Sequence, residues 1–176
     1  ACEAKDKYLQ GVFKDPTRDI HGEVSDRLYG PGNWTQEDRV RAKVYVFGSI
    51  YGLSPHSIGL AYGISETQAA REQKEFFSLI PDVMRWRDEI TTRAIKDQKL
   101  MTHFGRIRRF PLITRANKES VYKEALAFMP QSTANDICLE SMVNLNRAFR
   151  DPEAKWHGPT PQIKFLVHDS ITVECT

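Results

Sequence analysis

The sequence predicts an α+β fold that is mainly helical and carries a small antiparallel sheet towards its C-terminus. Apolar residues recur at helical spacing between capping and breaking residues through most of residues 1–100. Strand–turn–strand patterns lie at 100–113 and 162–175. A long helical pattern from about 120 to 149 lies between these two patterns.

Length and charge limit the classes of protein that the sequence can encode. At 176 residues the chain is one large domain or two small ones and can bury a core. Its 25 Lys and Arg against 23 Asp and Glu exclude a strongly basic tail-type binder but not a local basic groove. No apolar run reaches a membrane-spanning length, and the charged start ACEAKDKYLQ has no apolar signal core. We therefore expect a cytoplasmic protein without a membrane partner, with its three scattered cysteines reduced.

Local signals place the first helices. Residues 1–30 form helical pieces that end at the breaking sequence Gly30-Pro31-Gly32. Thr35 and Asp38 match a capping box, which predicts a helix over about 35–51. Gly52 can end this helix.

Three further helices are predicted after Gly52. Pro55 lies near the start of a short helix, Ser65 caps the next, and Pro81 opens a third. We interpret the apolar stripe along the last two as core, because amphipathic helices normally bury such a face. Its members are Ala69, Phe76, Phe77, Ile80, Val83, Trp86, Ile90 and Ala94.

The character of the sequence changes after residue 100. LMTHFGRIRRFPLI predicts a strand, a Gly turn and a second strand ended by Pro111. From Ser120 a long helix runs to about 149, interrupted near Pro130. QIKFLVHDSITVEC predicts two short strands with His168 and Asp169 at the bend between them.

A stripe of two cationic and two aromatic side chains runs along the helix at 35–51. Arg39, Lys43, Phe47 and Tyr51 recur every four residues, which places them on one helical face. The two cations suit phosphate oxygens and the two rings suit a flat ligand. The alternative is a solvated basic edge beside a buried aromatic edge. His21 is a lone histidine, and lone histidines are mostly structural.

Three other groups of residues could bind a metal ion or nucleic acid. Asp169 at the bend could bind Mg²⁺, although Asp is also simply a good turn residue. The hairpin arginines could grip a phosphate backbone or form a solvated basic turn; they are Arg106, Arg108 and Arg109. Amides after Pro130 could reach minor-groove acceptors or act as ordinary caps; they are Gln131 and Asn135.

Taken in order, these segments resemble the polymerase domain of family A (polymerase I-like) DNA polymerases. Residues 39–52 match that family's motif B, RxxxKxxxFxxxYG. DIH at 19–21, THFGRIRRFP at 102–111 and QSTANDI at 131–137 are similar to three further family segments. VHDS at 167–170 resembles motif C, which is usually V-H-D-E. The resemblance covers essentially the whole chain.

The resemblance implies a division of the α+β fold. Residues 1–100 would form mainly helical fingers, with the motif B helix at about 35–51. Residues 101–176 would form a partial palm whose small antiparallel sheet carries the catalytic β-hairpin of motif C. Motif A, the thumb and the exonuclease domain are absent from the sequence.

The resemblance also implies roles for particular residues in template-directed DNA synthesis, in replication or repair. The incoming dNTP would be bound by His21, Arg39, Lys43, Phe47, Tyr51 and Gly52. Catalysis would use Asp169, Lys43 and His168, with Asp169 binding Mg²⁺ and two such ions in the complete enzyme. Primer–template DNA would be contacted by Thr102, Arg106, Arg108, Gln131, Asn135 and His168.

Three departures from the family pattern lead to further expectations. The metal-binding Asp of motif A would lie before Ala1, so an upstream segment or a partner chain should supply it and these 176 residues alone should not polymerise. Ser170 replaces the usual Glu, and Ala127 stands where Asn is common. These departures leave a phage origin open beside a bacterial one.

Two alternatives remain for the function. One is a non-catalytic nucleic-acid-binding module, which the absent carboxylate favours. The other is a fragment of a single-subunit RNA polymerase, a class that typically has Met in place of Phe47 and lacks the T-x-x-G-R hairpin. Phe47 and the 102–111 segment therefore favour DNA synthesis.

Overall fold

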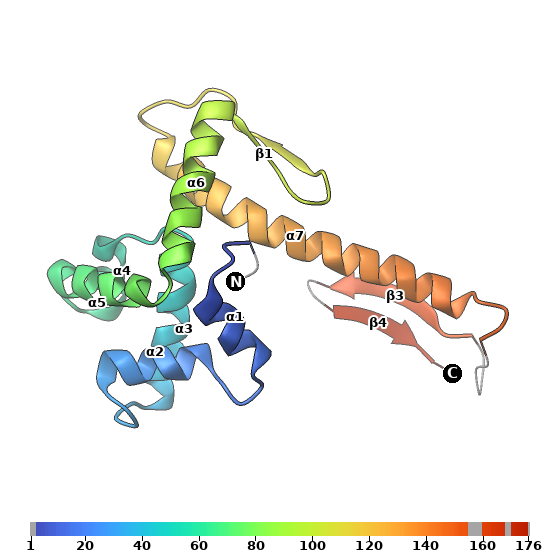
Figure 1. Ribbon diagram of the computed structural model, residues 1–176, viewed down its shortest axis with the longest axis horizontal. Coiled ribbons are helices and arrows are strands. Elements are labelled where there is room, and N and C mark those ends of the chain that lie inside the picture. Colours follow the sequence, from blue (N-terminus) through green and yellow to red (C-terminus); the bar gives the residue numbers. More distant parts are fainter. Residues whose placement is uncertain (1–2, 155–159, 168–169, 176) are drawn as a thin grey trace. The chain divides into compact units, whose positions relative to one another are not determined.

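The computed structural model describes residues 3–154, 160–167 and 170–175. These residues form helices and two small sheets, so the predicted α+β class is confirmed (Figure 1). Contacts divide the chain into two compact units, residues 1–100 with 109–127 and residues 101–108 with 128–176. The elements are α1 (Lys7–Lys14), α2 (Ile20–Tyr29), α3 (Gln36–Ile50), α4 (Pro55–Tyr62), α5 (Glu66–Leu79), α6 (Pro81–Asp97), β1 (Lys99–Met101), β2 (Ile107–Arg109), α7 (Lys118–Phe149), β3 (Gln162–Val167) and β4 (Ser170–Glu174).

The predicted capping box at the start of α3 is confirmed. The Thr35 hydroxyl accepts from the Asp38 backbone N–H at 3.3 Å, and the Asp38 carboxylate accepts from the Thr35 N–H at 2.9 Å. Each bond satisfies an N–H that the helix itself leaves unpaired. At the other end α3 stops at Ile50, and Gly52 takes a φ of 92° that other residues rarely adopt.

The next three helices begin where the sequence predicts. Ser54 caps α4 with Pro55 in its first turn, and the chain leaves α4 through Gly63 in the left-handed region. The Ser65 hydroxyl accepts from the Gln68 N–H at 3.1 Å and so caps α5. Pro81 opens α6. These local contacts turn the chain so that α5 packs against both α4 and α6.

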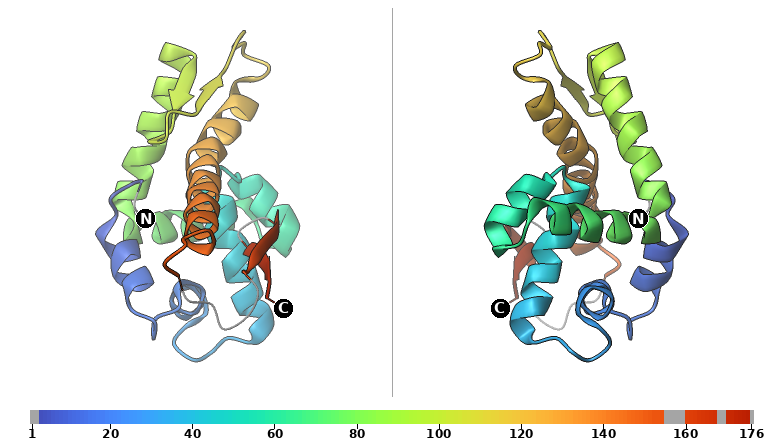
Figure 2. Two further views of the ribbon diagram at one scale, coloured as in Figure 1. Left: turned by 90° about the vertical axis from the view of Figure 1, so that its right-hand side faces the viewer. Right: turned by 90° about the vertical axis from the view of Figure 1, so that its left-hand side faces the viewer.

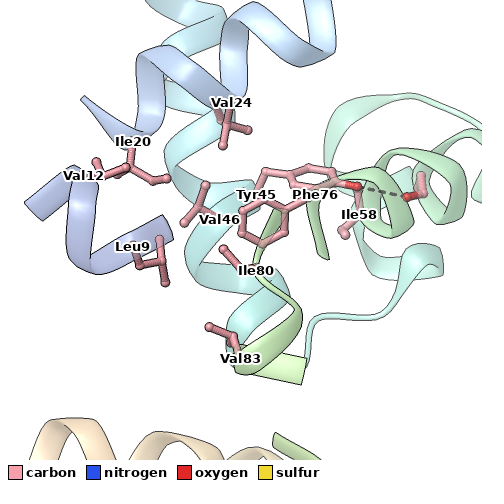
Figure 3. Close-up of a cluster of buried hydrophobic side chains, with 12 residues drawn as sticks. Leu9, Val12, Ile20, Val24, Tyr45, Val46, Ile58, Phe76, Ile80 and Val83 are labelled. Carbon is pink, nitrogen blue, oxygen red and sulfur yellow. Dashed lines mark hydrogen bonds between the residues drawn. The ribbon is translucent and has the colours of Figure 1, made fainter. Parts of the chain in front are cut away.

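The core of the first unit lies among helices α1 to α6 (Figure 3). The Tyr45 hydroxyl on α3 donates to the Ala69 carbonyl on α5 at 3.0 Å, which satisfies a buried polar atom. Phe76 meets the Tyr45 ring edge-on, with 6.3 Å between centroids. The buried apolar members are Leu9, Val12, Ile20, Val24, Ala42, Tyr45, Val46, Ile58, Ala69, Phe76, Ile80 and Val83. Most of the stripe predicted as core is therefore buried; Phe77 packs against the cluster.

We predict that the close approach between α4 and the turn that follows it makes Gly59 intolerant of substitution. A Cβ on Gly59 would lie 2.8 Å from the Ile64 backbone oxygen, which cannot rotate away. Gly59→Ala should lower the free energy of unfolding by about 2 kcal/mol. Gly48→Ala is the matched control, because its nearest atom is the flexible Leu53 Cδ2 and alanine favours the helix. Urea denaturation should separate the two variants; equal losses would contradict the role of the backbone contact.

The described residues also form two short β-pairs, β1 with β2 and β3 with β4. The chain turns between β1 and β2 through Gly105, whose φ is 81°. Strands β3 and β4 form an antiparallel pair (Figures 1 and 2). Their register runs from Gln162↔Glu174 to Val167↔Ser170, with an irregularity between Ile163 and Phe165. The predicted strands of the C-terminal segment are thus confirmed. The bend residues His168 and Asp169 lie outside the described residues.

The predicted interruption of the long helix at Pro130 is wrong. α7 runs without a break from Lys118 to Phe149 and contains Pro130. Proline removes one N–H donor, which is a small part of the bonding of so long a helix. Leu126 and Met129 on the preceding turn are buried, and such tertiary packing supplies most of a helix's stability.

No helix in the described part of the chain is long and apolar enough to cross a membrane.

Candidate functional site

Helix α3 buries one face and leaves the predicted stripe outside the core. Ala42, Tyr45, Val46 and Ser49 are its buried residues. Phe47, by contrast, keeps 47% of its surface exposed, although an isolated aromatic ring would gain by burial. The alternative of a buried aromatic edge is therefore wrong for Phe47, which is available to a ligand.

His21, on the neighbouring helix α2, lies beside this stripe. It lies in the first turn of α2, which packs against α3. Its ring centroid is 5.7 Å from that of Phe47, with the planes tilted by 54°. Its Nδ1 is buried and has no hydrogen-bond partner among the described residues. A buried polar atom without a partner is costly, so Nδ1 is a candidate contact for a bound group.

Asp19 connects the two helices and was not singled out in the sequence. Its carboxylate accepts from the backbone N–H groups of His21 and Gly22, both at 3.2 Å, and so caps α2. The same carboxylate accepts from Arg39 Nε at 2.7 Å. Only the Nε edge of the Arg39 fork is held among the described residues, so Nη1 and Nη2 remain available. The N-cap position of Asp19 before His21 was the sequence signal for this role.

The charges around His21 set its protonation. Burial lowers the pKa of His21, the Asp19 carboxylate raises it, and the cations Arg39 and Lys43 lower it. Lys43 is thus close enough to act on the imidazole, although it makes no ion pair among the described residues. For Asp19, burial opposes ionisation, but the hydrogen bonds from Arg39 and the α2 backbone lower its pKa. The result is a neutral imidazole beside two cations and one carboxylate.

We predict that an anion bound at Arg39 and Lys43 raises the pKa of His21, because negative charge favours the imidazolium. Binding would then take up a proton, so affinity for a triphosphate should increase as the pH falls from about 8 to 6. NMR titration of the imidazole protons, with and without tripolyphosphate, measures this shift. His56 is the internal control, because it is exposed and lies on α4 beside Glu66. An unchanged His21 titration would contradict the prediction.

Tyr51 and Gly52, the last two residues predicted to bind the dNTP, lie at the end of α3. The Tyr51 N–H donates to the Phe47 carbonyl at 3.0 Å, which closes the last helical turn. Burial raises the pKa of Tyr51, so its phenol stays neutral. Gly52 follows with its positive φ, and a Cβ there would lie 3.4 Å from Lys123 Cγ on α7. The first unit therefore brings together His21, Arg39, Lys43 and Phe47, with Tyr51 and Gly52 at the end of the same stripe.

Within the second unit, Thr102 and Arg106 are tied to α7. The Thr102 hydroxyl is buried and accepts from the Arg106 N–H at 3.2 Å. Arg106 Nε donates to Asp136 Oδ1 at 3.1 Å, and Nη2 also pairs with this carboxylate. The Arg106 hydrogen bond lowers the pKa of Asp136 and keeps it ionised. Asp136 is a structural partner that the sequence reasoning missed, because it lies far from Arg106 in the chain.

The other predicted DNA contacts are exposed on the second unit. Arg108 lies on β2, and Gln131 and Asn135 lie one helical turn apart on α7. The two amides share a helical face, which is what a ligand running along the helix needs. His168 and Asp169, predicted for catalysis and for Mg²⁺, lie outside the described residues. Among the described residues, no group of three or more His, Cys, Asp or Glu is placed to hold a metal ion.

A family model and several related proteins match this chain over almost its whole length. The sequence model of the protein family described as DNA polymerase family A matches residues 1–176. DNA polymerase I of Streptococcus pneumoniae is 29% identical over 177 residues, which cover 97% of this chain and 20% of that protein. The thermostable DNA polymerase I of Thermus filiformis is 30% identical over 174 residues, which cover 96% of this chain and 20% of that protein.

A solved structure shares the fold. The POL domain of Pol1 from M. smegmatis, in complex with DNA primer-template and dNTP, matches with a TM-score of 0.84 at 27% identity. The match covers 97% of this chain and 30% of that one. The chain thus spans about a fifth of the length of the curated relatives it matches.

Proposed function

This chain belongs to DNA polymerase family A, and on that premise we propose that it forms the dNTP-binding part of a DNA polymerase. The reaction is transfer of a nucleotidyl group from a dNTP to a primer 3′-hydroxyl, directed by a template. In the terms of the family, α1 to α6 correspond to fingers, and β3 and β4 to part of the palm.

The observation that carries the proposal is the gathering of His21, Arg39, Lys43 and Phe47 on an exposed face of α2 and α3. Two cations and an imidazole with an unpartnered nitrogen suit the oxygens of a triphosphate. Phe47 offers a flat apolar surface for the sugar and base. The order along α3 therefore matches a nucleotide lying with phosphates towards Arg39 and base towards Tyr51.

The second unit would contact the primer–template. Gln131 and Asn135 present amides that can donate to minor-groove acceptors, which every base pair offers. Arg106 and Arg108 would lie along the phosphate backbone, with Asp136 and the Thr102 hydroxyl holding the turn that carries Arg106. His168 would approach the primer end.

We further propose that Asp169 is a ligand of Mg²⁺, with two ions in the complete enzyme and Lys43 as proton donor to the leaving pyrophosphate. Magnesium prefers carboxylate and phosphate oxygens and stabilises the negative charge that develops in phosphoryl transfer. A second carboxylate of the D-x-S-x-x-E-x-R type is needed beside Asp169. Catalysis is therefore a property of the complete polymerase domain.

The experiment that tests the proposal compares two polypeptides in primer extension. One contains these 176 residues, and the other also carries a family segment with D-x-S-x-x-E-x-R. We expect extension with dNTPs only from the longer polypeptide, and its loss in Asp169→Asn. Binding of DNA without extension by the longer polypeptide would indicate a non-catalytic binding module. Preference for NTPs over dNTPs would indicate an RNA polymerase instead.

A further inference from the structure

The Asp19 carboxylate joins the first turn of α2 to an arginine of α3. Its Oδ1 accepts from the His21 N–H at 3.2 Å, and its Oδ2 accepts from the Gly22 N–H at 3.2 Å and from Arg39 Nε at 2.7 Å. The bond to Arg39 is the shortest of the three, and it is charge-assisted. A helix cap needs only the two backbone bonds, so the cap does not account for the bond to Arg39.

The way in which Asp19 binds Arg39 leaves the fork of the guanidinium open. A carboxylate commonly pairs with arginine through two parallel N–H···O bonds. Here Oδ1 of Asp19 is already bonded to the His21 N–H, and only Nε of Arg39 donates to Oδ2 among the described residues. Nη1 and Nη2 therefore keep their N–H groups, which can bind a phosphate bidentately.

Neighbouring groups keep this carboxylate in place and ionised. Gly22 is buried, and a Cβ there would lie 3.2 Å from Asp19 Oδ2, which is closer than an ordinary van der Waals contact. Burial raises the pKa of Asp19, but the hydrogen bonds from Arg39 and the α2 backbone outweigh it and lower this pKa. The Arg39 N–H donates to the Thr35 carbonyl at 3.1 Å, so the backbone of Arg39 is fixed within α3. Both ends of the Asp19–Arg39 bond thus lie on helices that pack together.

We propose that Asp19 is a positioning residue for the triphosphate, which holds the Arg39 guanidinium by Nε so that its terminal nitrogens are oriented before the ligand binds. This role rests on the proposed function, in which Arg39 binds phosphate oxygens. A mobile arginine loses rotamer freedom when it binds a ligand, and fixing it beforehand removes that loss from the binding step. Asp19 also repels a triphosphate through its charge. Salt screens this repulsion but does not change the orientation of Arg39.

The experiment measures binding of tripolyphosphate to the 176-residue chain by calorimetry, at about 0.1 M and about 0.5 M chloride. Asp19→Asn and Asp19→Ser both keep a good cap for α2 and remove the carboxylate that binds Arg39. At the higher salt each variant should bind about threefold to tenfold more weakly, because one long side chain must then be immobilised on binding. At the lower salt the loss should be smaller, because the variants also lose a repelling charge.

Asp26→Asn is the matched control. Asp26 lies on the same helix, but its carboxylate accepts from Trp34 Nε1 at 2.7 Å and from the Gly32 N–H at 3.1 Å. The substitution removes the same charge and should not weaken binding at either salt concentration.

A second measurement follows Arg39 directly and needs no ligand. Exchange of the Arg39 Nε–H with solvent, measured by NMR, should be about tenfold faster in Asp19→Asn, because a charge-assisted hydrogen bond is lost. It should stay unchanged in Asp26→Asn. An equal exchange rate in Asp19→Asn and the unmodified chain would contradict the proposed role.

A double-mutant cycle separates positioning from the cap. In an Arg39→Leu background, replacing Asp19 should weaken binding no further, because the positioned group is gone. Equal losses in both backgrounds would overturn the role, since Asp19 would then act through the α2 turn alone. Tighter binding by Asp19→Asn at low salt, with normal binding at high salt, would reduce Asp19 to a repelling charge. If Arg39→Leu alone left binding unchanged, the proposed function itself would fail.

Discussion

Replacing Arg39 with leucine is expected to weaken dNTP binding about 30-fold, which corresponds to about 2 kcal/mol. Among the described residues, Arg39 is engaged only at its Nε edge, by Asp19, so its two terminal nitrogens are available to donate to phosphate oxygens. Charge-assisted hydrogen bonds of this kind are among the strongest that a side chain makes. Calorimetric titration of the chain with a dNTP measures the loss. Tripolyphosphate should lose affinity in parallel, because the contact is to phosphate.

Arg41→Leu is the control for this prediction. Arg41 lies on the same helix two residues away, so it points to a different side of α3. Its guanidinium is half exposed and lies 3.7 Å from Asp38, away from the His21 cluster. The substitution removes the same charge and should weaken binding by no more than about twofold. Equal losses for the two variants would mean that the helix attracts nucleotides through its general charge, not through a defined contact.

Replacing Phe76 with alanine is expected to lower the free energy of unfolding by about 3 to 5 kcal/mol. Phe76 is 2% exposed and packs edge-on against Tyr45 (Figure 3). Its ring centroid is also 5.3 Å from that of Phe77. Its removal would leave a cavity where α3 and α5 meet and would loosen the helix that carries Arg39 and Lys43. Since small domains are stable by only about 5 to 15 kcal/mol, this loss is large. Urea denaturation followed by far-UV circular dichroism measures it.

Phe13→Ala serves as the comparison for Phe76, because the Phe13 ring on α1 is 67% exposed. Its removal should change the free energy of unfolding by less than about 0.5 kcal/mol. If the two variants had similar midpoints, Phe76 would not be part of a cooperatively packed core, and the first unit would not position the α3 stripe as described.

The parts of the fold that sequence predicts well are those set by neighbouring residues. The capping box at Thr35 and Asp38, the serine cap at Ser65 and the proline start at Pro81 each act over one helical turn. Their geometry depends on local backbone and side-chain chemistry, so a short sequence pattern is enough to predict where these helices begin. The same reasoning overestimated the effect of Pro130 on the continuity of α7. The loss of one hydrogen bond at Pro130 is outweighed by the burial of Leu126 and Met129, which a local sequence pattern does not reveal.

The sequence by itself determined the α+β class, the starts of α3 to α6 and the stripe of Arg39, Lys43 and Phe47. Capping residues mark the helix starts, and helical spacing alone places residues on one face. Only the tertiary structure decided which groups complete that stripe. Asp19 reaches Arg39 across 20 positions and Arg106 reaches Asp136 across 30. Gly52 and Arg87, from the turn after α3 and from α6, line one cavity. Such contacts depend on how whole helices pack, and no local pattern encodes that packing. The stripe was therefore predictable, whereas its counter-ion and the cavity beside Gly52 were not.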